Sequence, residues 1–127
     1  MTDANRGRFV WHDLMTTDLQ KAQAFYTKVF GWGTTIWEGG AAPMGVYRIF
    51  GRGSTPLGGM FNKPADMPAP PNWLPYVMVD SAKAALDRVT SSGGRVLNGP
   101  MEVPGGDWIG QCLDPQGVAF AIHSKKA

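Results

Sequence analysis

Three residues in predicted strands could do acid–base chemistry or bind a metal ion: His12, Asp13 and His123. An imidazole can act as an acid, a base or a ligand, and a carboxylate can act as a base or a counter-charge. Because side chains alternate along a strand, Asp13 lies on one face of the predicted strand 9–15 and His12 on the other. Asp13 is therefore the candidate catalytic group, unless it serves as a hydrogen-bond partner for a neighbouring side chain or the backbone. We expect His12 to be hydrogen bonded beneath a helix, and His123 to lie at a strand end, at the surface or near the rim of a pocket.

The other reactive side chains form no catalytic motif. Cys112 is the only cysteine and has no His or Asn pattern beside it, so a buried structural thiol is expected. Glu102 and Asp107 flank a Pro-Gly-Gly loop, where they either line the mouth of a pocket or are solvated. The paired glycines at 51–53 and 58–59 open no helix, so they predict no phosphate-binding loop.

A repeated unit must position these residues. Asp18 starts a predicted helix that ends at Gly31, and Ser81, 63 residues later, starts another that ends at Gly93-Gly94. Asp and Ser are favoured N-caps, and Gly is favoured where a helix ends in a left-handed residue. A predicted strand precedes each helix. The repeat therefore predicts two copies of one supersecondary unit.

Each copy is predicted to have the order β-α-β-β-β. Apolar runs bounded by turn residues predict strands over residues 9–15, 34–38, 46–50, 57–62, 73–79, from 96 onward, 109–113 and 118–123. Asp114-Pro115-Gln116-Gly117 has the sequence of a type I turn and precedes the last strand.

The expected fold is α+β and a single domain over residues 1–127. Two modules, 9–62 and 73–123, are joined by a proline-rich linker at 63–72. Their strands would form an eight-stranded curved mixed sheet, with the helices on its convex face and a cup on its concave face.

Composition excludes several classes of protein. The net charge is +2 and no stretch clusters Lys or Arg along one face, so no nucleic-acid partner is expected. No apolar run reaches the roughly 20 residues that span a bilayer, so no membrane partner is expected. Residues 1–8 are polar, unlike a signal peptide, and a lone cysteine suits a reducing compartment. A cytoplasmic location follows as the expectation.

Several motifs in a consistent order resemble the vicinal oxygen chelate superfamily, which includes glyoxalase I, extradiol dioxygenases, fosfomycin resistance transferases and bleomycin resistance proteins. They are Asp18 at the start of the first helix, Phe25-Tyr26 within it, Phe30-Gly31-Trp32 at its end, and the Asp114–Gly117 turn. The resemblance covers residues 9–123. It implies paired βαβββ modules and often a homodimer.

The resemblance also implies where a divalent metal would be bound. Enzymes of the superfamily typically hold Zn, Ni, Mn or Fe(II) with four inward-facing His, Gln or Glu residues. The matching positions here are Trp11, Leu74, Ala121 and one residue near 58–60, and none of them supplies a usable donor. No metal and no cofactor are therefore expected.

The concave face is expected to form the ligand pocket. The alternation of side chains predicts its lining as Phe9, Trp11, Asp13, Met15, Leu74, Tyr76, Met78, Ala119, Ala121 and His123, with Trp37 and Trp108 as walls. Apolar, aromatic and Met side chains with a few polar groups are typical of small-molecule sites, and aromatic faces favour flat or cationic ligands. The same residues could instead fill the cup or meet a second subunit.

The leading functional hypothesis is a metal-independent protein of the glyoxalase and bleomycin-resistance kind. It would bind a small hydrophobic or aromatic molecule, as a homodimer. One alternative is an enzyme of the superfamily, either a metal-dependent lyase, transferase or dioxygenase with relocated ligands, or one that uses Asp13 for acid–base catalysis. Another is a structural or regulatory dimer without a small-molecule ligand.

Overall fold

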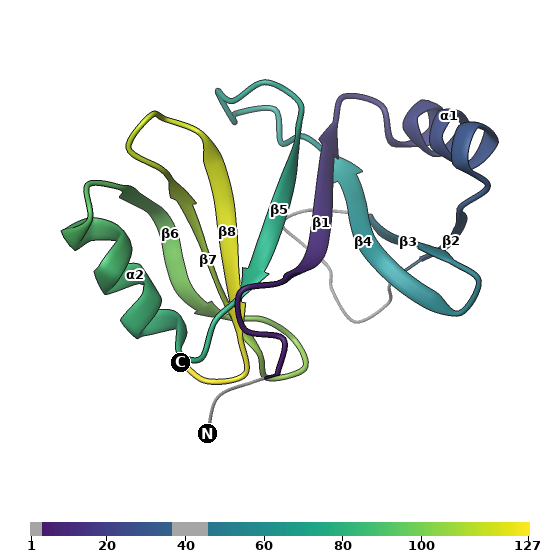
Figure 1. The fold of residues 1–127 in the computed structure, drawn as a ribbon. Coiled ribbons are helices and arrows are strands. Elements are labelled where there is room, and N and C mark those ends of the chain that lie inside the picture. The colour runs from purple at the N-terminus through teal and green to yellow at the C-terminus, as the bar shows by residue number, and fades with distance from the viewer. Residues whose placement is uncertain (1–3, 37–45) are drawn as a thin grey trace. The chain divides into compact units, whose positions relative to one another are not determined.

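The computed structural model describes residues 4–36 and 46–127, and these residues form two compact units (Figure 1). The first unit is Trp11–Trp73, and the second combines Leu74–Ala127 with the residues before Trp11. The described residues contain eight strands and two helices, in the order βαβββ-βαβββ. The predicted α+β class and the repeated unit are confirmed. The single domain and the linker at 63–72 stay predictions. Trp37 lies outside the described residues.

The first unit contains β1 (Phe9–Thr16), α1 (Leu19–Phe30), β2 (Gly33–Ile36), β3 (Tyr47–Arg52) and β4 (Thr55–Asn62), with the start of β1 before the unit boundary. Its strands lie in the order β2-β3-β4-β1. β1 runs parallel to β4, and the other neighbours are antiparallel. The sheet is therefore mixed.

The second unit repeats this order with β5 (Asn72–Met78), α2 (Ala82–Ser91), β6 (Arg95–Glu102), β7 (Trp108–Leu113) and β8 (Ala119–Ser124). Its strands lie in the order β5-β8-β7-β6, and β5 and β8 form the parallel pair. β6 extends well beyond the expected start at 96–97, to Glu102. Two irregularities in its pairing with β7 accompany this length.

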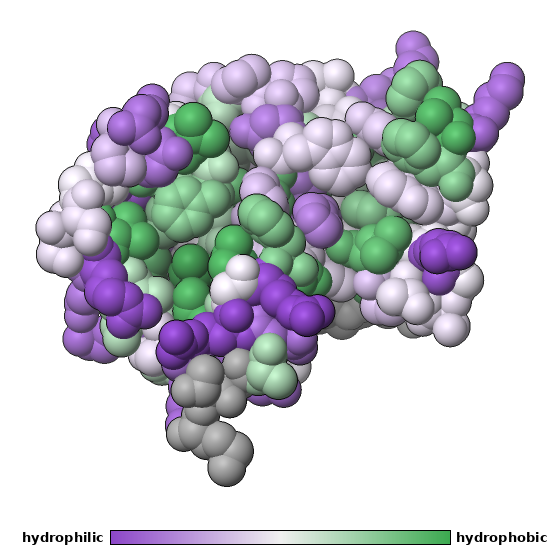
Figure 2. Space-filling model, in the orientation of Figure 1, coloured by the Kyte–Doolittle hydropathy of each residue, from purple (hydrophilic) through white to green (hydrophobic). Residues whose placement is uncertain are grey.

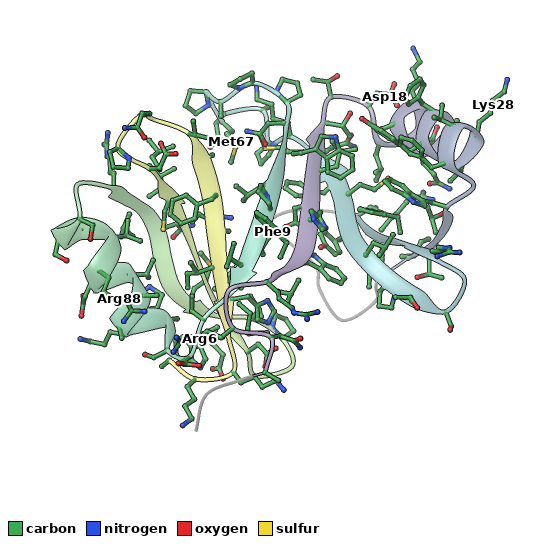
Figure 3. The ribbon with its side chains drawn as sticks, in the orientation of Figure 1. Arg6, Phe9, Asp18, Lys28, Met67 and Arg88 are labelled. Atoms are coloured by element: carbon green, nitrogen blue, oxygen red, sulfur yellow. The ribbon has the colours of Figure 1, made fainter. Side chains whose placement is uncertain are left out.

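Both helices begin at the predicted N-cap residues and α1 ends at the predicted Gly31, whereas α2 ends at Ser91 with Ser92 as its C-cap, before the predicted Gly93-Gly94. The Asp18 side chain accepts a hydrogen bond from the Lys21 amide at 3.0 Å, and Gly31 ends α1 with φ of 74°. Figure 3 labels Asp18 and Lys28, which lie at opposite ends of α1. In α2, the Ser81 hydroxyl accepts a hydrogen bond from the Ala84 amide at 3.2 Å. A side-chain oxygen at the N-cap satisfies an amide that has no partner within the helix.

Each helix covers one face of its own sheet. The core under α1 is Leu14, Leu19, Ala22, Phe50 and Met60. The core under α2 is Ala82, Leu86, Cys112 and Ile122. In β1, Leu14 points to the helix, so Trp11 and Asp13 lie on the opposite face, as the alternation predicts. We call this second face of each sheet the helix-free face.

Candidate functional site

A hydrogen-bonded network occupies the helix-free face of the first unit. The Trp11 indole Nε1 donates to Asp13 Oδ1 at 3.0 Å and to the Tyr47 hydroxyl oxygen at 3.0 Å. The Tyr47 hydroxyl donates in turn to Asp13 Oδ1 at 2.6 Å. Tyr47 is buried, and Trp11 and Asp13 are half-buried. A carboxylate oxygen that accepts two such bonds holds both rings in fixed positions.

Gly59 makes this network sterically allowed. It lies opposite Asp13 in the pairing of β1 with β4 and opposite Ile49 in β3. A Cβ atom at Gly59 would lie 1.9 Å from Cζ and the hydroxyl oxygen of Tyr47. The phenol ring therefore crosses the sheet directly above this glycine, which is how it reaches Asp13 from β3.

The other predicted acid–base residue of the first unit, His12, lies on the opposite face and is exposed. Its Nδ1 is 3.3 Å from the Leu57 carbonyl oxygen. The ring is thus hydrogen bonded as expected, but the expectation that the helix covers it was wrong. α1 buries only Leu19 and Ala22 against the sheet, so it does not extend its cover to His12.

The helix-free face of the second unit carries a different polar pair. His123 Nε2 lies 2.7 Å from Asp107 Oδ2, and the two side chains are 23% and 40% exposed. Tyr76, Met78 and Ala121 of the same face are buried. The pairing of strands places Met78 and Ile109 on either side of His123. This pair combines an imidazole with a carboxylate, the usual composition of a proton-transfer site.

Trp108 does not line this face. It packs against the core cluster under α2 and pairs with Ser124, which is fully buried. The expectation that Trp108 forms a wall of the pocket was wrong, because residue 109, not 108, lies opposite His123 in the β7–β8 hairpin. Two further predicted pocket residues lie nearer the surface: Phe9 is 64% exposed, and Leu74 is half-buried.

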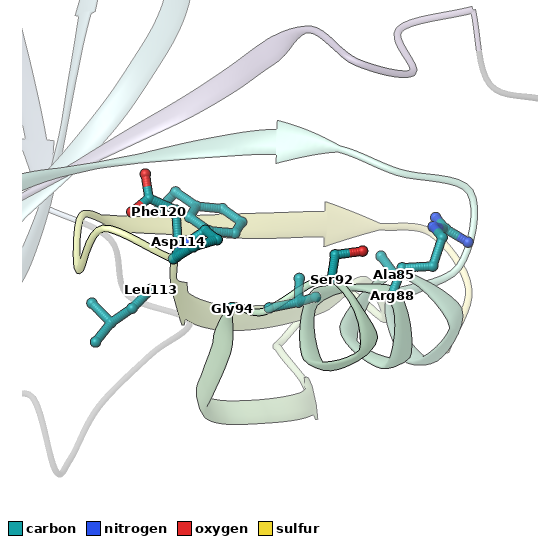
Figure 4. A pocket seen from close by; sticks show the side chains of 9 residues that line it. Ala85, Arg88, Ser92, Gly94, Leu113, Asp114 and Phe120 are labelled. Carbon is teal, nitrogen blue, oxygen red and sulfur yellow. The ribbon is translucent and has the colours of Figure 1, made fainter.

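A hollow of about 320 Å³ lies on the other side of the second unit, next to α2 (Figure 4). Its lining is Ala85, Arg88, Val89, Ser92, Gly94, Leu113, Asp114, Pro115 and Phe120. Phe120 and Asp114 lie at one end and Arg88 at the other. Since Phe120 packs on the helix-side core, this hollow is separate from the helix-free face that carries the predicted pocket residues.

Cys112 is fully buried in the core under α2. Burial raises the pKa of its thiol, because removal from water disfavours the thiolate. A protonated, inaccessible thiol is a poor nucleophile, so the expectation of a structural cysteine fits its surroundings.

Tyr47, Gly59 and the role of Asp107 were not found from the sequence. Tyr47 reaches Asp13 across 34 residues of chain, and Asp107 reaches His123 across 16. The alternation of residues within one strand does not predict contacts between side chains of different strands or loops. The four-residue turn Asp114–Gly117 is one signal that could have predicted the register of β7 with β8. That register determines which side of the sheet residues 108 and 109 occupy.

Comparison with known proteins assigns the family. The model of the Glyoxalase/Bleomycin resistance protein/Dioxygenase superfamily matches residues 8–122. The chain belongs to this superfamily.

Curated relatives come from two bacterial genera. "Putative glyoxylase CFP32" of Mycobacterium tuberculosis is 32% identical over 117 residues, which are 88% of this chain and 43% of that protein. The anthracycline biosynthesis protein DnrV of Streptomyces peucetius is 30% identical over 138 residues, which cover 98% of this chain and 50% of that protein. The chain thus spans about half the length of the curated relatives that it matches.

Solved structures share the fold. A variant of Streptomyces coelicolor methylmalonyl-CoA epimerase in complex with 2-nitronate-propionyl-CoA matches with a TM-score of 0.70 and 15% identity, over 96% of this chain and 99% of that chain. The Mn(II)-bound glyoxalase of Novosphingobium aromaticivorans matches with a TM-score of 0.59 and 21% identity, over 100% of this chain and 41% of that chain. Within the described residues, neither helix is long and apolar enough to cross a membrane.

The residues at the family's metal-ligand positions do not fit a divalent metal. Gly59 lies opposite Asp13, and Ala121 lies opposite the equivalent residue Tyr76. Gly59 is therefore the fourth position, within the predicted range 58–60. The four side chains are therefore those of Trp11, Gly59, Leu74 and Ala121, which offer no oxygen, imidazole or thiolate ligand. In the part of the chain that the structure describes, no three His, Cys, Asp or Glu residues form a group that could hold a metal.

Proposed function

We propose that this protein binds a small hydrophobic or aromatic molecule on a helix-free sheet face, without a metal ion. The observation that carries this proposal is the Trp11–Asp13–Tyr47 network. Trp11, a member of this network, occupies a position where the family resemblance expects a metal ligand. The network offers an aromatic surface there instead of a metal donor.

The network favours ligand binding because its rings are already ordered. Side chains that become immobilised on binding cost free energy, whereas Trp11 and Tyr47 are held by hydrogen bonds before a ligand arrives. Flat ligands can stack on an indole face, and the Asp13 carboxylate favours a positive charge nearby. A flat apolar or cationic aromatic compound matches these properties.

The names of the relatives agree with small-molecule chemistry but do not define this chain's ligand. One relative is named for glyoxylase activity and another for anthracycline biosynthesis. Each is about twice as long as this chain, so the activity of the whole relative is a separate question. The chain supplies its own evidence, in the residues of the helix-free faces.

A homodimer is the second part of the proposal, and α1 is the surface that supports it. Phe25, Val29 and Phe30 of α1 are 58%, 54% and 58% exposed. Figure 2 shows hydrophobic residues gathered over α1 between hydrophilic ones. A second copy of the chain is the occupant we propose, since the matched relatives contain about two chain lengths in one protein. The cytoplasm, expected from the sequence, is the proposed location.

A thermal-shift screen tests the binding proposal. Flat aromatic compounds, neutral and cationic, should raise the melting temperature of protein that has been dialysed against a chelator. Trp11→Ala should remove the shift, because it removes the stacking surface. Val118→Ala, which shortens an apolar side chain that is 60% exposed, is the control and should retain the shift. A screen without hits, or equal shifts in both variants, would contradict the proposal.

A further inference from the structure

We infer that the second unit recognises a hydroxyl group on the ligand, with His123 as the acceptor, so that the ligand class is hydroxylated aromatic compounds. This inference rests on the proposed function, because it assumes ligand binding on a helix-free face, and it concerns the face of the second unit alone. It adds the chemical group that the ligand carries and the atom that recognises it, Nδ1 of His123.

The argument starts from the pairing of His123 with Asp107. Nε2 of the imidazole and Oδ2 of the carboxylate are 2.7 Å apart, a short distance for such a bond. An ionised carboxylate can only accept hydrogen bonds. The proton of this bond therefore belongs to Nε2, and in the neutral ring Nδ1 carries the lone pair. Asp107 fixes His123 as an acceptor at Nδ1.

Nδ1 has no hydrogen-bond partner among the described residues, whereas Nε2 is fully engaged. The imidazole is 23% exposed, so a ligand on this face can reach it. Its backbone is fixed, because the His123 carbonyl accepts a hydrogen bond from the Val79 amide at 2.9 Å. The imidazole is thus held in place and partly exposed.

The loop between β6 and β7 directs Asp107 toward His123. The Val103 amide donates to the Asp107 carbonyl at 2.8 Å, and the Gly106 amide donates to the Val103 carbonyl at 3.0 Å. Gly105 and Gly106 have φ values of 103° and 92°, which side chains rarely tolerate. This tight turn is specified by its sequence, and it places a carboxylate beside the imidazole.

The surroundings of the pair explain why an aromatic hydroxyl suits it. Ile109 lies opposite His123 in β7 and is half-buried, whereas Met78 on the other side is buried. The partly exposed apolar side chain of Ile109 beside one acceptor matches an aromatic ring with one hydroxyl group. When the hydroxyl donates to Nδ1, its proton either stays on oxygen or moves to Nδ1. In the second case the ligand becomes a phenolate, and Asp107 stabilises the imidazolium through Nε2–H.

A pair of probes separates recognition of the hydroxyl from burial of the ring. We would titrate the chelator-dialysed protein with 4-nitrophenol and with 4-nitroanisole, in which a methyl ether replaces the hydroxyl. The wild type should bind 4-nitrophenol at least about tenfold more tightly, since the ether leaves Nδ1 without a donor. His123→Leu should reduce this preference to near unity while 4-nitroanisole binding stays unchanged. Asp107→Ala should reduce it in part, because the ring loses its fixed tautomer.

His12→Leu is the matched control, because His12 is exposed on the opposite face of the other unit. It should leave the preference intact. Absorbance of the nitrophenolate adds a second readout, since binding should increase the phenolate fraction in the wild type and not in His123→Leu. Equal affinities for the two probes in the wild type would overturn this inference alone. Binding of neither probe would overturn it together with the proposed function.

Discussion

The two units repeat one backbone but place opposite chemistry on their helix-free faces. In the first unit, Asp13 Oδ1 accepts from both Trp11 and Tyr47, so this polar cluster bonds to itself. In the second unit, His123 is bonded to Asp107 on one ring nitrogen only. The first face thus offers rigid aromatic surface, and the second offers a hydrogen-bond acceptor.

Single residues at equivalent places account for this difference. Gly59 of β4 corresponds to Ala121 of β8, because they lie opposite Asp13 and Tyr76 respectively. The glycine leaves room for the Tyr47 ring, whereas a methyl group fills that place in the second unit. Ile109 is the counterpart of Tyr47 in the repeat, because it lies opposite His123 as Tyr47 lies opposite Phe61. Isoleucine cannot donate a hydrogen bond as the tyrosine does. A repeat therefore fixes the backbone of a site without fixing its chemistry.

The largest expected effect comes from making the first unit resemble the second with Gly59→Ala. The new Cβ would lie 1.9 Å from the Tyr47 ring, which must leave Asp13 and Trp11 to make room. We expect the free energy of unfolding to fall by about 2–4 kcal/mol, measured by urea denaturation. Gly33→Ala is the control, since no atom lies within 4 Å of its Cβ position, and it should change stability little. Equal effects of the two variants would show that Tyr47 does not depend on Gly59.

Tyr47→Phe tests the network without a steric change. It removes the hydroxyl that donates to Asp13 at 2.6 Å and accepts from Trp11. The free energy of unfolding should fall by about 1–2 kcal/mol, because a partly buried carboxylate loses a charge-assisted bond. In a double-mutant cycle with Trp11→Phe, the two losses should be less than additive. Strict additivity would mean that the two donors act independently.

Asp107→Ala should have a smaller effect on stability than Tyr47→Phe. Asp107 is 40% exposed, and water competes for its hydrogen bond, so we expect a loss of about 1 kcal/mol or less in urea denaturation. The main effect should instead be on the nitrogen resonances of His123, which should shift toward a mixture of tautomers. A stability loss equal to that of Tyr47→Phe would indicate that the second pair is structural.

The smallest effect concerns Cys112 and appears only at high pH. Because burial raises the pKa of this thiol in the folded state, the unfolded chain loses the thiol proton at a lower pH than the folded protein does. The contribution is fully present below the unfolded thiol's pKa of about 8.5 and is lost as pH rises toward the folded value. Wild-type stability should therefore fall more steeply above this pH than that of Cys112→Ala. Parallel curves would contradict a buried, protonated thiol.

Most of the fold could be predicted from local signals, and the site only in part. Asp18 and Gly31 bound α1 through their own caps, and the alternation in β1 placed Leu14 in the core and Asp13 opposite it. These features depend on residues that are near each other in sequence. Asp13's partner Tyr47 depends instead on the β3–β4 register and on Gly59, which one strand alone does not encode.

The errors also have physical causes. Trp108 was expected in the pocket because of its type, but the β7–β8 register places it opposite Ser124 and on the helix side. Asp107 was identified only as a loop acid, because its direction is set by a turn with two left-handed glycines. The pairing of Asp107 with His123 is a tertiary contact that residue types alone do not predict.

The central claim is that the helix-free side binds an aromatic ligand without a metal. Calorimetric titration tests it most directly, with one aromatic hit from the thermal-shift screen, before and after dialysis against EDTA, and again after adding Mn(II) or Zn(II). The predicted result is one dissociation constant in all conditions, with loss of binding in Trp11→Ala. Binding that disappears with EDTA and returns with the metal would contradict the account.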